Sequence, residues 1–164
     1  MSRKIKTSLQ NLLAHEHGAV VRDWGHRRPI ALVYPNHYPV GMSNLGFQTV
    51  YHLLNAHPDL VCERVFLPDE DLGQEYRRTQ TPLLSLESQR PLHDFAAVAF
   101  SLSFEPDYLN VLNILELARM PLLAASRGES FPLIVAGGVA AMLNPEPLAP
   151  FLDAFFLGEA DALA

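Results

Sequence analysis

The stretch Ala31–Asn55, with the sequence ALVYPNHYPVGMSNLGFQTVYHLLN, decides the fold of this chain. An apolar run leads into a polar segment that contains Gly41 and Gly46, and apolar residues at helical spacing follow. In an open α/β sheet, such a strand-to-helix loop lies at the carboxyl end of the strand, where ligands bind. The stretch therefore predicts both a class of fold and the place of a site.

Apolar runs of strand length recur along the chain, with helical patterns between them. They are Ile30–Tyr34, Val61–Phe66, Ala97–Ser101, Leu133–Ala136 and Ala154–Leu157. Apolar residues at consecutive positions are typical of parallel strands that are buried on both faces. We therefore expect a doubly wound α/β fold, a five-stranded parallel sheet of flavodoxin-like, Rossmann-like order 2-1-3-4-5 in three α/β/α layers.

Three helices are predicted from spacing and capping residues. The first begins near Ser43 or Asn44, either of which can cap it, and its apolar face consists of Phe47, Val50, Tyr51 and Leu54. The acidic residues 69–71 and the basic residues 77–78 suit the two ends of a second helix. The third begins at Pro106 and ends before Pro121.

Two segments are harder to assign. We expect the residues after Gly138 to be largely non-helical, because Pro145, Pro147 and Pro150 each fix φ and lack an N–H donor. Residues 80–94 form a long connection in which Leu83–Leu86 can add a small edge strand.

The composition limits the number of domains and the kinds of partner that we expect. The 164 residues are 49% hydrophobic, which supports one folded domain at 19–164 behind an amphipathic or poorly ordered lead-in at 1–18. With a net charge of -6 and only 12 Lys and Arg residues, nucleic acid is not an expected partner. Cys62 is the single cysteine, so no internal disulfide forms, and no apolar run is long enough to span a membrane. We expect a cytoplasmic protein.

The predicted strand order brings four loops to one edge of the sheet. These are residues 36–44, 101–105, 137–147 and 158–161, which would frame one site. Gly41, Gly137 and Gly138 would admit a ligand, because they have no Cβ. The side chains that would orient it by hydrogen bonding belong to Asn36, Ser43, Asn44, Ser101 and Ser103. The alternative is structural: the glycines turn the chain and the serines cap a helix.

Other chemistries find little support. The seven histidines include no pair at helical ligand spacing, so no metal site is predicted, and only His37 lies on the expected edge. GxSxG, GxxxxGK[ST] and GxGxxG are absent from the sequence, which argues against hydrolase, P-loop and dinucleotide-binding functions. A receiver domain would need Asp where the third strand ends, and Ser101 stands there. No catalytic residue is assigned.

From about Val20 to Asp161 the chain resembles the N-terminal domain of a family of radical S-adenosylmethionine proteins. The segments that carry the resemblance are GMSNLGFQTVYHLLN, ERVFLPDEDL, PLLSLESQRPLHDFAAVAFSLSFEPDYLNVLNILELARMPL and PLIVAGGVAAMLNPEPLAPFLDAFFLGEAD. The resemblance implies a domain related to cobalamin-binding domains that precedes a radical core with a CxxxCxxC motif. That core would hold a [4Fe–4S] cluster and S-adenosylmethionine, and it would be the partner of this domain. This chain has no such motif, so we expect a domain of a longer enzyme.

The resemblance to cobalamin domains can be followed residue by residue. The best-known of them carry DxHxxG after the first strand, and the His of this motif binds cobalt. The same frame here keeps Gly41, but it has Asn36 for Asp and Tyr38 for His, and a phenol is a poor cobalt ligand. His37 is one residue out of frame. Gly137 and Gly138 match the glycine pair of these domains.

Two classes of function stay open, with a third that has less support. In the first, the domain positions cobalamin, or another large planar ligand or substrate, beside the radical core. In the second, it is a scaffold that packs against the core or receives a macromolecular substrate and binds no cofactor. The third is a flavodoxin-like flavin binder, although the loop at 36–44 is not rich in Ser and Thr, as would be expected around a flavin phosphate.

Overall fold

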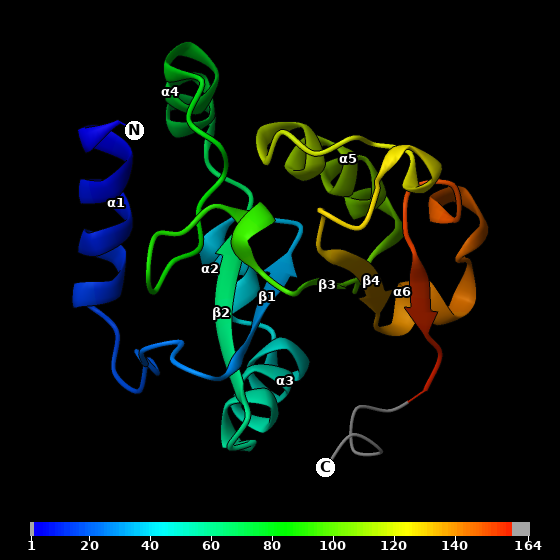
Figure 1. The fold of residues 1–164 in the computed structure, drawn as a ribbon, viewed down its shortest axis with the longest axis horizontal. Coiled ribbons are helices and arrows are strands. Elements are labelled where there is room, and N and C mark those ends of the chain that lie inside the picture. Colours follow the sequence, from blue (N-terminus) through cyan, green and yellow to red (C-terminus); the bar gives the residue numbers. More distant parts are fainter. Residues whose placement is uncertain (1, 159–164) are drawn as a thin grey trace.

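The computed structural model describes residues 2–158 and contains a single parallel sheet with helices around it (Figure 1). The strands are β1 Arg28–Tyr34, β2 Leu60–Phe66, β3 Ala97–Ser101, β4 Leu133–Gly137 and β5 Ala154–Phe156. The α-helices are α1 Arg3–Ala14, α2 Tyr38–Met42, α3 Leu45–Ala56, α4 Glu70–Thr79, α5 Tyr108–Leu117 and α6 Val139–Leu143. Short 3-10 turns lie at Leu92–Asp94, Glu105–Asp107, Ala124–Ser126 and Glu146–Leu148.

The strand order is β2-β1-β3-β4-β5, with every neighbouring pair parallel, which confirms the predicted doubly wound fold. Val33 of β1 lies opposite Val65 of β2 and Phe100 of β3. Ser101, at the end of β3, lies opposite Gly137. The carboxyl ends of the strands therefore form one edge of the sheet, which we call the carboxyl edge.

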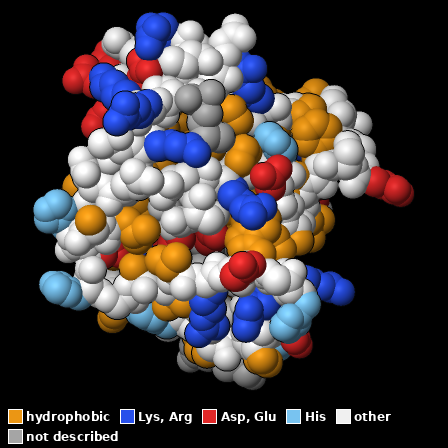
Figure 2. Space-filling view, turned by 60° about the vertical axis from the view of Figure 1, so that its left-hand side comes forward, with side chains coloured by type: hydrophobic (Ala, Val, Ile, Leu, Met, Phe, Trp, Pro, Cys, Tyr) orange, Lys and Arg blue, Asp and Glu red, His pale blue; other side chains and the backbone are white. Residues whose placement is uncertain are grey.

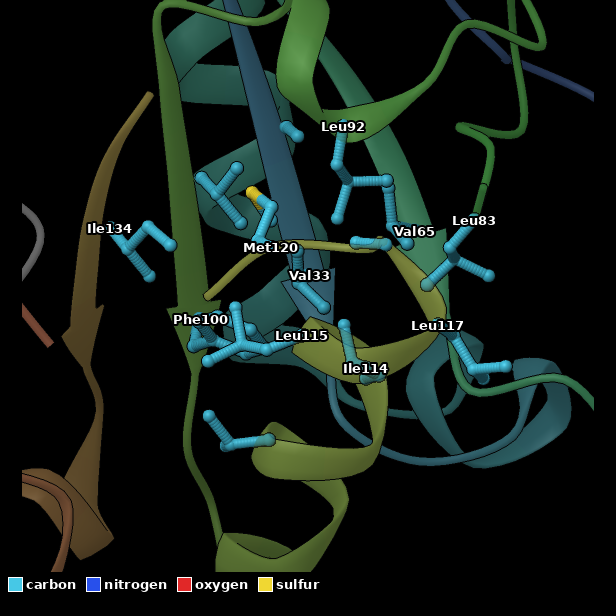
Figure 3. Packing of buried hydrophobic residues seen from close by; sticks show 14 of the residues in the cluster. Val33, Val65, Leu83, Leu92, Phe100, Ile114, Leu115, Leu117, Met120 and Ile134 are labelled. Carbon is cyan, nitrogen blue, oxygen red and sulfur yellow. The ribbon is translucent and has the colours of Figure 1, made fainter. Parts of the chain in front are cut away.

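Both faces of the sheet are covered, as the consecutive apolar residues of the strands predict. On one face, Leu32 and Cys62 pack with Phe47 and Tyr51 of α3. The larger core lies on the other face, where α5 covers the strands. Figure 3 shows this core, in which Val33 and Val65 of the sheet belong to one cluster with Ile114 of α5.

Two of the three predicted helices begin where their caps indicate, and the third, α5, begins at Tyr108, two residues after the predicted start at Pro106. The Asn44 side chain accepts a hydrogen bond of 2.9 Å from the amide of Phe47, so α3 begins after Asn44 and not after Ser43. Asp69 caps α4 in the same way, with a bond of 2.8 Å from the amide of Leu72. A 3-10 turn at Glu105–Asp107 precedes α5.

Two predictions are wrong. Leu83–Leu86 is not an edge strand, because this segment makes one isolated bridge, between Leu84 and Pro91, and is otherwise a buried connection. Its Leu86 amide bonds to the Arg64 carbonyl, which covers the open side of β2. The residues after Gly138 are helical at first, since α6 completes a five-residue helix before the prolines begin.

The lead-in is an ordered amphipathic helix, α1. Its Ile5 and Leu9 belong to the main core, and the Ser2 hydroxyl donates a 2.6 Å hydrogen bond to the Glu75 carboxylate of α4. Figure 1 shows α1 beside β2, on the side of the sheet away from β5. Ser8, Leu9 and Leu12 of this helix line a cavity next to β2.

Candidate functional site

The carboxyl edge brings together polar residues from the loops after β1 and β3. Asn44 donates a 3.0 Å hydrogen bond to the Ser103 hydroxyl, and Asn36 donates a 2.9 Å bond to the Asp107 carboxylate. We call these four residues the edge cluster. Asn36, Asn44 and Ser103 were predicted to share a site, whereas Asp107 was missed because Asp after Pro106 resembles an ordinary helix start. The other Asp107 oxygen is buried and has no hydrogen-bond partner among the described residues.

The glycines at this edge have neighbours from their own chain where a Cβ would stand. A Cβ on Gly41 would lie 2.5 Å from the Phe66 ring, and one on Gly138 would lie 2.5 Å from the Leu102 carbonyl oxygen. Gly138 also has φ +102°, which L residues rarely adopt. At Gly137 the nearest atom is the Phe156 Cβ, at an ordinary 3.4 Å. Packing inside the chain thus accounts for Gly41 and Gly138 without a ligand.

The predicted serines have different surroundings. The Ser43 hydroxyl donates a 2.8 Å hydrogen bond to the Val40 carbonyl and thereby caps the carboxyl end of α2. The residue is exposed. Ser101 is half-buried at the end of β3, beside Gly137. The predicted loop at 158–161 lies outside the described residues from Glu159 onward.

His37 and Tyr38 turn away from the edge cluster, toward β2. The Tyr38 hydroxyl donates a 2.7 Å hydrogen bond to the Glu16 carboxylate, and its ring lies edge-on to Phe66 with centroids 5.2 Å apart. Burial, together with the bond to Glu16, raises the pKa of Tyr38 to about 12. His37 Nδ1 lies 3.1 Å from the Leu67 carbonyl oxygen. The structure therefore divides the predicted site residues between two places.

Large exposed hydrophobic side chains also lie along the carboxyl edge, at or after the ends of the strands, and the sequence patterns did not indicate them. They are Leu45, Phe104, Val139, Met142, Leu143, Phe156 and Leu157, which we call the edge patch. Leu45 follows Asn44 and Phe104 follows Ser103, so the bond between Asn44 and Ser103 places these two apolar residues near each other. Phe156 of β5 pairs with Gly137 of β4, and Val139 begins α6 just after β4. The patch thus has members at or after the ends of β1, β3, β4 and β5, and exposed apolar side chains gathered at one edge of a sheet point to an interaction site.

The second place is a cavity of about 370 Å³ beside β2. Its walls come from α1, the residues after β1, the end of β2, α4 and residues 83–86. His37 and Tyr38 contribute to the wall, together with Leu12, Phe66 and Leu72. No residue of β3, β4 or β5 lines it, so the cavity is separate from the edge cluster.

A buried ion network forms the floor of this region. Arg64 of β2 pairs with Glu16 and with Glu87, each at 2.7 Å, although its side chain is only 3% exposed. The amide of Arg64 also donates to Glu87 at 2.7 Å, and the Tyr51 hydroxyl does so at 3.1 Å. Sequence reasoning treated β2 as an apolar strand and missed this network. It ties the residues after α1 to the sheet.

Residues 2–158 contain no clustered metal ligands and no membrane-spanning helix. No group of three or more His, Cys, Asp and Glu side chains gathers among residues 2–158. Cys62 is buried in β2, and this burial raises the pKa of its thiol well above the usual range. No described helix is long and apolar enough to cross a membrane. On the side that carries α1, basic, acidic and hydrophobic side chains are interspersed (Figure 2).

Comparison with known proteins gives two findings. Residues 46–164 match the model of the family described as radical SAM proteins, N-terminal. The chain is also 27% identical over 130 residues to an uncharacterised protein of Methanocaldococcus jannaschii. That alignment covers 79% of this chain but only 23% of the relative, so most of the relative has no counterpart here.

Proposed function

This chain belongs to the radical SAM proteins as their N-terminal domain, and from this premise we propose that its carboxyl edge packs against the radical core and positions a substrate or cofactor there. One observation carries the proposal. The edge cluster bonds the loops after β1 and β3 to each other, and the exposed side chains of the edge patch lie on the same edge of the sheet. Burying apolar area contributes about 25 cal/mol per Å², so covering these side chains with a second domain would contribute favourably to its docking.

The cluster and cofactor of radical chemistry would lie in that core. A [4Fe–4S] cluster is held by cysteine thiolates, and this chain has only Cys62, which is buried in the sheet. S-adenosylmethionine would bind beside the cluster. The role that we assign to this domain is therefore to bind and orient and to exclude water, not to perform the radical step.

Cobalamin remains a second candidate, supported by the amide and hydroxyl groups of Asn36, Asn44 and Ser103 at the edge. Its fit to the described residues is poor. Tyr38, which replaces the cobalt-binding His of cobalamin domains, is bonded to Glu16 and lies at the cavity beside β2. The space that Gly41 and Gly138 would leave for a corrin ring is occupied by Phe66 and by the Leu102 backbone.

Thiol labelling in the full-length protein tests the proposed interface. Phe104, at 60% exposure, and Val21, at 62%, offer matched positions for cysteine substitution, one in the edge patch and one outside it. Alkylation of each new thiol would be followed by mass spectrometry of its peptide, which separates it from any other cysteine. We expect Phe104→Cys to react at least about tenfold more slowly than Val21→Cys, because thiol reactivity depends on access. Equal rates would refute a covered edge.

Absorption spectroscopy tests the second candidate. Full-length protein would be incubated with hydroxocobalamin and passed through a desalting column. We expect no corrin absorbance in the protein fraction. A stoichiometric corrin spectrum that is lost in Asn44→Leu but kept in Asn110→Leu would instead assign cobalamin to the edge cluster.

A further inference from the structure

The cavity beside β2 has the properties of a small-molecule site. It encloses about 370 Å³, at the lower end of the range of about 300–1,000 Å³ that is usual for ligand pockets. Leu12 and Leu72 line it from the two helices, and the rings of Tyr38, Phe66 and Tyr76 line it as well. Such walls favour flat, apolar molecules, because aromatic side chains pack on rings.

Charge narrows the class of ligand. Among the described residues, Arg64 is the only arginine or lysine that lines the cavity, and its guanidinium is already paired with both Glu16 and Glu87. An incoming anion would find no unpaired cation there, and it would be repelled by the two carboxylates that flank Arg64. An uncharged ligand avoids this cost.

The hydrogen-bonding groups on the cavity wall narrow the class of ligand further. The Tyr38 hydroxyl donates to Glu16, so its oxygen keeps a lone pair that can accept. His37 is exposed where it lines the wall, and when its Nδ1–H donates to Leu67 its Nε2 is an acceptor. Ser8 adds a hydroxyl on the same wall. These groups suit a ligand with one N–H or O–H donor.

We propose that this cavity, enclosed by α1, the end of β2 and α4, binds a small uncharged molecule that carries an aromatic ring and one hydrogen-bond donor. The site is distinct from the carboxyl edge, because its walls contain no residue of β3, β4 or β5. It therefore goes beyond the proposed docking function and does not depend on it. Helix α1 is part of the site, since Ser8, Leu9 and Leu12 all line the cavity.

Indole is a suitable probe, because it is uncharged, aromatic and has one N–H donor. Indole-3-acetate is its matched anionic partner. Binding of both to the full-length protein would be followed by saturation-transfer NMR, with Kd from titration. We expect saturable binding of indole with a Kd on the order of 1 mM, as befits a fragment of this size. Indole-3-acetate should bind at least about tenfold more weakly, because of the carboxylates beside Arg64.

Variants locate the binding. Leu12→Trp fills the cavity from α1 and should abolish the indole signal, whereas Leu109→Trp, at a position 72% exposed and outside the cavity, should leave it unchanged. If Leu12→Trp fails to fold by circular dichroism, Leu72→Phe fills the same space from α4. The proposal is overturned if indole shows no saturable binding, or if the filled variants bind it as the wild type does. Tighter binding of indole-3-acetate would also overturn it, since the site would then select an anion.

Discussion

Gly138 gives the sharpest test of the carboxyl edge, because a ligand-binding role and a packing role predict different results for Gly138→Ala. The residue has φ +102° and ψ 173°, a conformation that costs an L residue about 1–3 kcal/mol. The new Cβ would also lie 2.5 Å from the Leu102 carbonyl oxygen, and moving this backbone costs about 1–3 kcal/mol more. The same oxygen accepts the amide of Ala140 at 3.2 Å, so α6 would be disturbed as well. We expect the free energy of unfolding to fall by about 2–6 kcal/mol.

Urea unfolding of the 164-residue chain, followed by far-UV circular dichroism, measures this loss directly. Two other glycines separate its causes. Gly18 has a positive φ of 87° but no atom within 4 Å of the new Cβ, so Gly18→Ala should cost only about 1 kcal/mol. At Gly128 there is neither a positive φ nor a close neighbour, so Gly128→Ala should change stability by less than about 0.5 kcal/mol. If Gly138→Ala is as stable as Gly128→Ala, the packing account is refuted, and the absence of a Cβ at Gly138 would need another explanation, such as a ligand.

Three further predictions concern the interior. Arg64→Met should lower the free energy of unfolding by about 3–5 kcal/mol, because it leaves two buried carboxylates without a cation. The Arg78 side chain is 73% exposed, so Arg78→Met should change the free energy of unfolding by less than about 1 kcal/mol. Equal effects of the two substitutions in urea unfolding would contradict the buried network. The pKa of Tyr38 is raised to about 12, so on raising the pH the unfolded chain loses the Tyr38 hydroxyl proton before the folded chain does, and stability should decline as pH rises from 10 to 12. Tyr38→Phe should reduce that decline. If the wild type and Tyr38→Phe lose the same free energy of unfolding between pH 9 and pH 11, Tyr38 is not the cause. Cys62 should react with a disulfide reagent only in urea, since its thiol is buried in the native chain, and rapid native labelling would show that the sheet opens.

The sheet could be predicted from the sequence because its signal is local. Consecutive apolar residues mark each strand, and the strands found in the structure start and end within two residues of the predicted runs. Asn44 and Asp69 are side chains that cap a helix by bonding to residues three positions later, so the starts of α3 and α4 could also be predicted.

The features that could not be predicted from the sequence depend on contacts between residues that are distant in the chain. Pro39 and Gly41 suggest a loop, yet α2 forms there because Pro suits a first helical turn and Gly41 packs against Phe66. The direction of the Tyr38 side chain is decided by Glu16, which lies 22 residues away and is placed by α1. Glu63 and Arg64 break the apolar pattern of β2, and only their partners in the residues after α1 and in the 80–94 segment make their burial favourable.

The side chains of the edge cluster already have hydrogen-bond partners within the chain, and this limits how the carboxyl edge can bind a ligand or a partner domain. Asn44 already caps α3 and bonds to Ser103, while Asn36 bonds to Asp107 and to the amide of His37. A polar ligand would have to break these bonds and replace them at little net gain, since exchanging one hydrogen bond for another contributes only about 1 kcal/mol. The edge patch carries no such cost, because its side chains exchange contact with water for contact with protein. Recognition at this edge is therefore expected to rest on apolar contact over a broad surface, with the edge cluster holding the loops after β1 and β3 in the shape that a partner domain meets.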